Sequence, residues 1–531
     1  ADDNEVHLNG ATVTGDVSGG AAAGTGNLLS VKGVNSAKWI AGFQKVSFDT
    51  AGVAAGQHML TITDTANRTA LDWNALTATG TARGIDLIYH EQGIDLSNYT
   101  AGSVKSALSA DGKSEYDIEA VREGGTVKRI AYNSYQFKDA RTAESSIYNE
   151  TWGGRSVIGN TTTGNEITVT SGTHTDVYGG WTRGASSQTA TADKGNSTDN
   201  KVTVDGTATV SGNVYGGMTT VSGGKASHNE VTINKGVTLS SGDVYGGSAA
   251  DGSSVDDNKV YLNGIDTPGN VYGGSAGLGT ANGNEVHLNG ATVTGAVFGG
   301  SGASASKNKV YLNGAQVTGD VYGGNAASAD DNEVHLNGAR VTGDVYGGAA
   351  NGTGNLLSVK GVNRAGWIAG FQKVTFDATG VAADATMLNV NGGVGTTFER
   401  GAIDATGSTV NGGITLLHNA NGITVNGLAA DDNILKSEAD AATEKNIAAH
   451  RTGGNITDIR YEGYRFAGVT TPVIDGGEAF GGISKAGNAT HDNVITVNGD
   501  YTNVYGGHTS GAGTTKDDKN NSYNNAVTIT G

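Results

Sequence analysis

The sequence predicts an all-β protein, a right-handed parallel β-helix (solenoid) with irregular insert loops. Three observations carry this prediction: a short glycine-ended motif recurs along the chain, apolar and polar residues alternate inside each repeat, and charges alternate in sign between repeats. A repeat period of about 20 to 50 residues indicates a solenoid, because each unit buries its apolar face only by lying on its neighbours.

The recurring motif is a pentapeptide: Asp, Asn or Ala, then Val, then Tyr, Phe or Ser, then two glycines. It occupies residues 16–20, 176–180, 213–217, 243–247, 270–274, 296–300, 320–324, 344–348 and 503–507. Between residues 176 and 344 the successive spacings are 37, 30, 27, 26, 24 and 24 residues, and the extra length falls in polar stretches after the glycines. These stretches are therefore predicted to be loops of variable length.

Each repeat is predicted to hold three short strands. In the unit that begins at residue 308, Val310 and Leu312 alternate with polar neighbours, as expected for a half-buried strand. Gly314 indicates a turn, and further strands are expected around Val317 and Val321. We interpret the paired glycines of the motif as corner glycines with positive φ. Successive units would form coils about 4.8 Å apart.

Charged residues form a predicted ladder between coils. The residue after the first Asn of each coil alternates in sign through seven consecutive units: Glu166, Lys201, Glu230, Lys259, Glu285, Lys309 and Glu333. Stacking in register would place each of these side chains between opposite charges, at about 0.2 to 1 kcal/mol for an exposed pair. We interpret the ladder as a device that disfavours slipped coils.

Composition excludes several classes of protein. The 531 residues include 87 Gly, 2 Pro and no Cys, and the glycines follow no collagen period. The net charge is −18, from 34 basic and 52 acidic residues, which argues against nucleic acid or an anionic membrane as a partner. No apolar run approaches the roughly 20 residues that span a bilayer. Disulfides and thiolate metal sites are excluded.

A longer repeat overlies the short one. Residues 1–60 align with residues 329–388 at an offset of 328, with 49 of 60 positions identical. The predicted organisation is β-helix coils at 1–60, irregular β-helix with inserts at 61–150, regular coils at 151–388, a second irregular part at 389–475, and regular coils with a truncated end at 476–531. Neither end resembles a polar cap, so we expect the chain to be a segment of a larger protein.

The two irregular parts are expected to continue the helix with longer coils and protruding loops. Residues 126–137 alternate as a strand does, and residues 437–450 are a candidate short helix.

Units of this form resemble the repeats in passenger domains of large Gram-negative autotransporter adhesins. The resemblance rests on the coils with the Val-Tyr-Gly-Gly motif and covers about two thirds of the chain. It implies a secreted, surface-exposed β-helix that passes through an outer-membrane barrel and mediates attachment or aggregation. The scarcity of Cys and Pro and the acidic pI of about 4.9 agree with it.

No chemistry-bearing motif stands out. Acidic pairs precede the Asn of several coils at residues 2–3, 256–257, 330–331, 431–432 and 517–518, and they suit turns better than a loosely bound cation. His287 and His335 would lie two rungs apart with Tyr311 between them, too far to share one metal ion. Nucleophile-elbow, zinc-protease and phosphate-loop motifs are missing. We therefore predict no catalytic residues, no metal and no cofactor.

The candidate binding surface in the regular part is an aromatic stripe. The residue after the motif's Val should point outward, where it would stack on sugar rings or pack against another fibre. The tyrosine stripe comprises Tyr178, Tyr215, Tyr245, Tyr272, Phe298, Tyr322, Tyr346 and Tyr505. The alternative is that the rings only stack on one another. Loops of the first irregular part offer a second site, with Trp73, Tyr89, His90, Tyr99, Tyr132, Tyr135 and Phe137.

The function expected from these observations is a non-enzymatic adhesin stalk at the cell surface. Its partner would be a glycan or protein of a host or bacterial surface, or another copy of the chain. A self-assembling extracellular fibre or sheath subunit is the alternative. A β-helix enzyme acting on carbohydrate is a third, which would require clustered carboxylates in a cleft.

Overall fold

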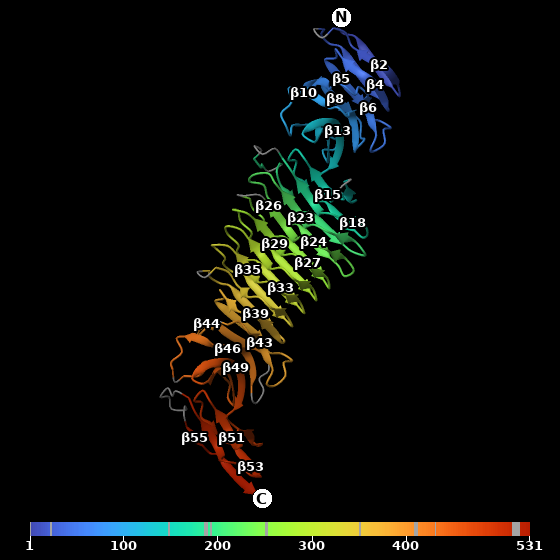
Figure 1. Cartoon of the computed structure of the whole chain (residues 1–531). Helices are drawn as coiled ribbons and strands as arrows, with labels where there is room; N and C mark the ends of the chain where they lie inside the picture. Colours follow the sequence, from blue (N-terminus) through green and yellow to red (C-terminus); the bar gives the residue numbers. More distant parts are fainter. Residues whose placement is uncertain are drawn as a thin grey trace.

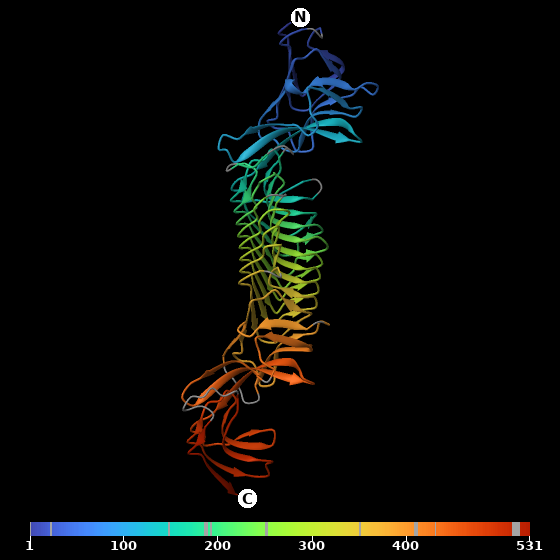
Figure 2. The same cartoon turned by 90° about the vertical axis from the view of Figure 1, so that its left-hand side faces the viewer.

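The computed structural model describes residues 1–531 except 1, 22–23, 147–148, 185–188, 192–193, 250–252, 350–351, 394, 408–412, 431, 512–520 and 531. The chain forms a parallel β-solenoid of about 19 turns, so the predicted fold class is correct. It is an elongated rod with its termini at opposite ends (Figure 1). Short strands stack into continuous ladders along the regular coils (Figure 2).

Two ten-stranded parallel sheets form most of the regular rod. The first consists of β17 (Glu166–Val169), β21 (Lys201–Val204), β24 (Glu230–Ile233), β27 (Lys259–Asn263), β30 (Glu285–Asn289), β33 (Lys309–Asn313), β36 (Glu333–Asn337), β39 (Leu356–Lys360), β42 (Lys373–Asp377) and β45 (Ile403–Thr406). The second, parallel beyond its first pair, consists of β14 (Glu144–Ser145), β15 (Thr151–Ser156), β19 (Val177–Thr182), β23 (Val214–Thr219), β26 (Val244–Ala249), β29 (Val271–Ala276), β32 (Val297–Ser301), β35 (Val321–Asn325), β38 (Val345–Tyr346) and β41 (Ile368–Ala369).

The third face of each coil is a two-residue strand. In the coil that begins at Asn308 this is β34 (Gln316–Val317), which pairs with β31 (Thr292–Val293) and β37 (Arg340–Val341). Val310, Leu312, Val317 and Val321 are all within 1% of full burial. The three-strand coil with inward-facing Val and Leu is therefore confirmed.

The two kinds of glycine in a coil have different roles. Gly314 has a φ of 62° at the corner, as predicted. Gly323 and Gly324 have no positive φ; a Cβ on Gly323 would lie 2.6 Å from the carbonyl oxygen of Gly347, and one on Gly324 would lie 2.2 Å from that of Ala305. The interpretation of the paired glycines as positive-φ corners was therefore wrong in the regular coils, although Gly20 of the first motif has a φ of 143°. They are required because the backbones of neighbouring segments approach closely there.

The first Asn of each coil forms a buried ladder that the sequence analysis did not foresee. The amide of Asn308 donates to Oδ1 of Asn332 at 3.1 Å, and the backbone N–H of Asn308 donates to the same oxygen at 3.0 Å. Equivalent contacts join the residues Asn165, Asn200, Asn229, Asn258, Asn284, Asn308, Asn332 and Asn355. Each side-chain amide donates to the side-chain oxygen of the next Asn, so these buried polar groups have hydrogen-bond partners inside the rod.

The irregular parts interrupt the stack of coils. In the first, β11 (Val104–Leu108), β12 (Ser114–Glu123) and β13 (Thr126–Gln136) form an antiparallel sheet that joins β9 (Ile85–His90). In the second, β47 (Ile434–Ala439), β48 (Thr443–Thr452) and β49 (Asn455–Arg465) join β46 (Ile414–Asn426) in the same way. The expected longer coils thus include two matching antiparallel inserts, which lie between stacks of coils (Figures 1 and 2).

The predicted helix at residues 437–450 is wrong. The segment belongs to β47 and β48, and Asp440 accepts hydrogen bonds from the N–H groups of Ala442 and Thr443 at the turn between them. The predicted strand at 126–137 is confirmed as β13. Local helix propensity at Ala and Glu was overridden by pairing of β48 on both edges.

Candidate functional site

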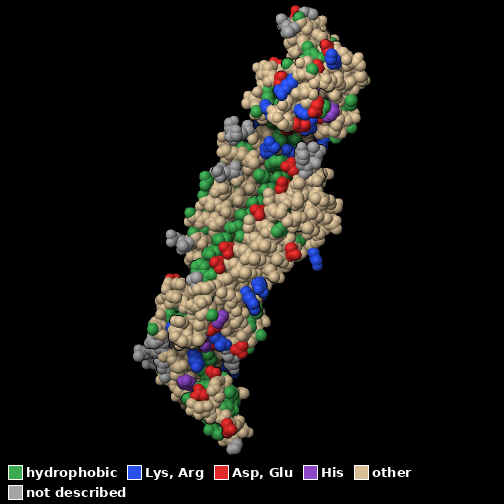
Figure 3. Space-filling model, viewed as in Figure 1, with side chains coloured by type: hydrophobic (Ala, Val, Ile, Leu, Met, Phe, Trp, Pro, Cys, Tyr) green, Lys and Arg blue, Asp and Glu red, His purple; other side chains and the backbone are tan. Residues whose placement is uncertain are grey.

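The tyrosine stripe is one continuous aromatic stack in the regular coils. Neighbouring ring centroids from Tyr178 to Tyr346 lie 5.0, 4.9, 4.8, 4.7, 5.1 and 4.9 Å apart, with ring planes within 11° of parallel. Tyr505 lies in the separate C-terminal coils and stacks on Phe480 at 5.0 Å. A hydrophobic band flanked by acidic side chains marks this face of the rod in Figure 3.

Four hydroxyls of the stripe bond to the first residue of their motif: Tyr245, Tyr322 and Tyr346 donate to an Asp, and Tyr215 accepts from Asn213. Tyr322 donates to Asp320 at 3.1 Å and Tyr346 donates to Asp344 at 3.0 Å. Burial and the Asp320 carboxylate raise the pKa of Tyr322 to about 12. Where the ring is Phe298 and has no hydroxyl, the motif begins with Ala296 instead of Asp.

Both ends of the stack are covered. At one end Trp181 stacks on Tyr178 at 4.7 Å, and the guanidinium of Arg155 lies 4.5 Å from the ring centroids of both Trp152 and Trp181. At the other end Trp367 meets Tyr346 edge to face. The flat faces of the rings are occupied by other rings, so ring edges and hydroxyls form the accessible surface of the stripe.

The charge ladder is in register over seven strands of the first sheet, from β17 to β36, and ends where Glu333 pairs with Leu356. Each of its seven residues is the direct partner of the next, from the Glu166–Lys201 pair to the Lys309–Glu333 pair. Close ion pairs form in one direction only: Lys201 with Glu230 at 2.9 Å, Lys259 with Glu285 at 3.7 Å and Lys309 with Glu333 at 3.4 Å. The predicted register is confirmed, because each ladder residue is paired with residues of opposite charge on the adjacent strands of the ladder. The close contacts are one-sided, because each lysine side chain points to the glutamate of the following coil.

The acidic pairs are turn residues where the structure describes them. Asp257 and Asp331 adopt positive φ values of 58° and 55°. Asp330 accepts the backbone N–H of Thr353 at 2.7 Å. Asp431 and the pair 517–518 lie outside the described residues.

The histidine column packs as the sequence suggested. Tyr311 lies between His287 and His335, with ring centroids 4.5 Å from each. Within the described part of the chain, no group of three or more His, Cys, Asp or Glu side chains could hold a metal ion.

The aromatic residues expected on projecting loops of the first irregular part mostly belong to the core. Trp73, Tyr132, Tyr135 and Phe137 are buried, as is His90, whose Nδ1 accepts the N–H of Thr69. Tyr89 stacks on His58, and Tyr99 packs against Trp73. Their apolar faces support the insert, so the predicted loop site does not form from these seven residues.

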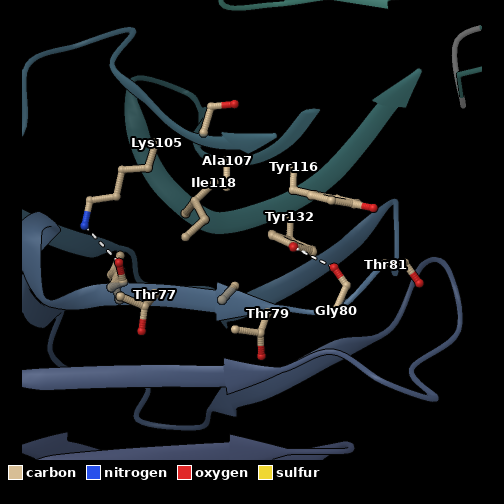
Figure 4. Close-up of a pocket in the computed structure, with 12 residues that line it drawn as sticks. Thr77, Thr79, Gly80, Thr81, Lys105, Ala107, Tyr116, Ile118 and Tyr132 are labelled. Carbon is tan, nitrogen blue, oxygen red and sulfur yellow. Dashed lines mark hydrogen bonds between the residues drawn. The ribbon is translucent and has the colours of Figure 1, made fainter. Parts of the chain in front are cut away.

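A pocket that the sequence analysis missed lies where the first insert arches over β8 (Leu76–Thr79). It has a volume of about 470 Å³ (Figure 4). Its apolar wall includes Ile118, Tyr116 and Tyr132, and the two rings are 6.4 Å apart and nearly parallel. Tyr132 donates to the carbonyl of Gly80 at 2.8 Å, and Lys105 Nζ donates to that of Leu76 at 2.8 Å.

A second missed feature is a buried acidic pair at the joint between the first insert and the regular coils. Glu115 accepts hydrogen bonds from the Ser156 hydroxyl, the Val157 N–H and the Asn160 amide at 2.6–2.8 Å. Asp117 lies on the same buried face of β12, and burial with the nearby Glu115 charge raises its pKa to about 9. The 328-residue offset is the signal that would have drawn attention to this pair, because Glu444 repeats these contacts.

Comparison with known proteins does not place the chain in a family. No protein-family profile matches it, and no curated sequence matches it either. Among the described residues, no helix is both long and apolar enough to cross a membrane.

Proposed function

We propose that this chain is a stalk segment of a bacterial surface adhesin, with a mechanical and binding role rather than a catalytic one. The observation that carries the proposal is the in-register stacking of the regular coils, with ten strands in each of two sheets. A rod of about 19 turns at about 4.8 Å per turn would be on the order of 90 Å long. Such a rod can hold a binding surface well away from a cell.

Three features of the rod support a load-bearing role. From β17 to β36, each interface between neighbouring coils has an asparagine contact and a ring contact, and every second interface also has an ion pair. The inserts are built on the same plan at both ends of the regular rod. Repetition of the plan indicates modules added in series.

The resemblance to autotransporter passenger repeats gives the proposal its location, the outer surface of a Gram-negative cell. The net charge of −18 and the lack of cysteine suit an extracellular protein that crosses an oxidising space unfolded. The proposed partner is a glycan or protein on another cell, or a second copy of the chain.

The test is an adhesion assay with the purified chain. Beads coated with the chain should attach to epithelial cells or aggregate with one another, and beads coated with an unrelated globular protein of similar negative charge should do neither. Attachment equal to that of the control beads, together with no aggregation, would refute the proposal.

A further inference from the structure

The two inserts can be compared residue by residue through their strand registers. Lys105 on β11 is the partner of Ile118 on β12, and Lys436 on β47 is the partner of Ile447 on β48. By the same registers Tyr116 corresponds to Lys445 and Ala107 to Glu438. On the coil beneath, Thr77 corresponds to Asp404.

In the second insert, the residues equivalent to Lys105, Ala107 and Thr77 form ion pairs. Lys436 Nζ lies 2.8 Å from Asp404 Oδ1 and 3.0 Å from Glu438 Oε1. The position that corresponds to Tyr116 holds a further cation, Lys445. The equivalent lysine of the second insert, Lys436, is therefore neutralised by carboxylates of the chain.

In the first insert the same lysine has no carboxylate partner. Thr77 and Ala107 replace both acids, and among the described residues no carboxylate oxygen lies within 4.0 Å of Lys105. Lys105 Nζ donates to the carbonyls of Asn74 at 3.0 Å and Leu76 at 2.8 Å, which leaves one of its three N–H groups. Burial lowers the pKa of Lys105, and the charge of Asp72, which is not in contact with it, only partly opposes this; the ammonium also lies 5.8 Å from the ring centroid of Trp73.

The pocket next to this lysine has the shape and lining for a small ring. Tyr116 is half-buried and runs nearly parallel to Tyr132, and Lys105 lies across the pocket from them (Figure 4). A volume of about 470 Å³ is within the range of small-molecule sites. The apolar face of a pyranose would pack on Tyr116.

We propose that the first insert binds an acidic sugar, a pyranose that carries a carboxylate, with the carboxylate on Lys105 and the ring on Tyr116. The inference rests on the proposed adhesive function and names its ligand class. A single acidic sugar is favoured over a polyanion, because the net charge of −18 repels highly charged polymers.

An extended peptide on the free edge of β8 fits less well. Thr79 O accepts the Thr50 N–H on the side of β5 (Lys45–Asp49), so the carbonyls of Leu76, Ala78 and Gly80 point to the other side. Lys105 and Tyr132 already bond to the first and last of these. Of these three carbonyls, that of Ala78 is left for a bound peptide, and one hydrogen bond is too few for strand addition.

The experiment is a titration of the full chain, followed by ligand-observed NMR and calorimetry. The probes are glucuronic acid, its neutral relative glucose, acetate and an extended uncharged heptapeptide. Glucuronic acid should bind at one site per chain, at least tenfold more tightly than glucose, and acetate and the peptide should not bind. Absence of glucuronate binding, or preference for the peptide, would overturn the proposal.

Variants copied from the second insert make the test specific. Thr77→Asp and Tyr116→Lys should each weaken glucuronate binding at least tenfold, and Lys105→Met should reduce it to the level of glucose. Lys436→Met is the matched control and should change nothing. Glucuronate binding that survives both Thr77→Asp and Lys105→Met, in chains with unchanged circular dichroism, would refute the assignment.

The converse exchange tests sufficiency. Asp404→Thr, Glu438→Ala and Lys445→Tyr together should raise the stoichiometry from one site to two. A stoichiometry that stays at one would show that the exchanged residues do not determine binding. Bead adhesion is measured in parallel: sugar binding without adhesion refutes the stalk proposal alone, and adhesion without sugar binding refutes only the pocket.

Discussion

The amide of Asn446 donates a 2.8 Å hydrogen bond to Glu444, and the first insert replaces this pair with Asp117 and Glu115. Ionised, Asp117 has no close hydrogen bond to either of its buried oxygens, and the Ser106 hydroxyl beside it lowers the pKa by less than burial and Glu115 raise it. Protonated, it can donate to Glu115 as Asn446 does to Glu444. The raised pKa of Asp117, to about 9, has burial as its main cause, followed by the charges of Glu115 and Glu119. The acidic pair therefore shares a proton at neutral pH.

This pair predicts a pH dependence. Between about pH 4 and 9 the folded chain holds a proton on Asp117 that the unfolded chain has lost, so stability falls as pH rises through this range, by at most about 1.4 kcal/mol per unit. Asp117→Asn should remove the fall: it should match the parent near pH 4 and exceed its stability increasingly toward pH 9. Hydrogen exchange of residues 156–160 across this range measures the effect.

The second insert supplies the reciprocal control for that experiment. Asn446→Asp should introduce a similar fall at its own joint, near residues 484–488, and leave residues 156–160 unchanged. Parallel pH curves for the parent and Asp117→Asn would contradict the shared proton.

Glu115 is predicted to lock the first insert onto the regular coils. Glu115→Ala would leave three buried donors, on Ser156, Val157 and Asn160, without their acceptor, at a local cost of about 1 to 3 kcal/mol for each donor that finds no other partner. The expected result is faster hydrogen exchange at residues 156–160. Glu119→Ala, at a half-buried position on the same strand, is the control and should have a small effect. Unchanged protection in Glu115→Ala would show that the joint is held by other contacts.

The regular coils were predictable from sequence because their stabilising contacts repeat. Val310 faces inward and Lys309 pairs with Glu333, and equivalent residues do the same in the neighbouring coils. The repeat period and the strand register can therefore be read directly from the sequence. The inserts were not predictable, because their antiparallel pairing does not recur from coil to coil: Ala449 on β48 pairs with Ile459 on the next strand, and the turn at Asp440 reverses a segment with helical composition. The pocket depends on that pairing and so was missed.

The charge ladder predicts an electrostatic penalty for reversal. Lys309→Glu would put three acidic side chains on adjacent rungs, at positions 285, 309 and 333. Because these side chains are partly exposed, the expected loss of stability is no more than about 1 kcal/mol and should shrink in high salt. Lys309→Met removes the ion pair without adding repulsion and should lose less. Thermal unfolding at low and high salt measures both, and a reversal variant as stable as Lys309→Met at low salt would refute the ladder.

Variants of the tyrosine stripe can distinguish a structural role of these rings from an adhesive one. Tyr322 stacks on Phe298 and Tyr346 and also donates to Asp320. Tyr322→Ala with Tyr346→Ala should destabilise these coils, at about 0.5 to 1.5 kcal/mol for each lost stacking contact beyond the area term. Tyr322→Phe with Tyr346→Phe keeps the stack, as Phe298 does naturally, and should lose only the hydroxyl contacts.

Because ring edges and hydroxyls are the accessible part of the stripe, the phenylalanine pair is the sharper test of adhesion. If the stripe attaches to a partner, bead adhesion should fall in the Phe variant while its thermal stability stays within about 1 kcal/mol of the parent. Full adhesion in the Phe variant, and in any alanine variant that remains folded by circular dichroism, would leave the stripe with its structural role alone. Attachment would then have to be sought on the inserts, where the pocket beside Lys105 is the first place to test.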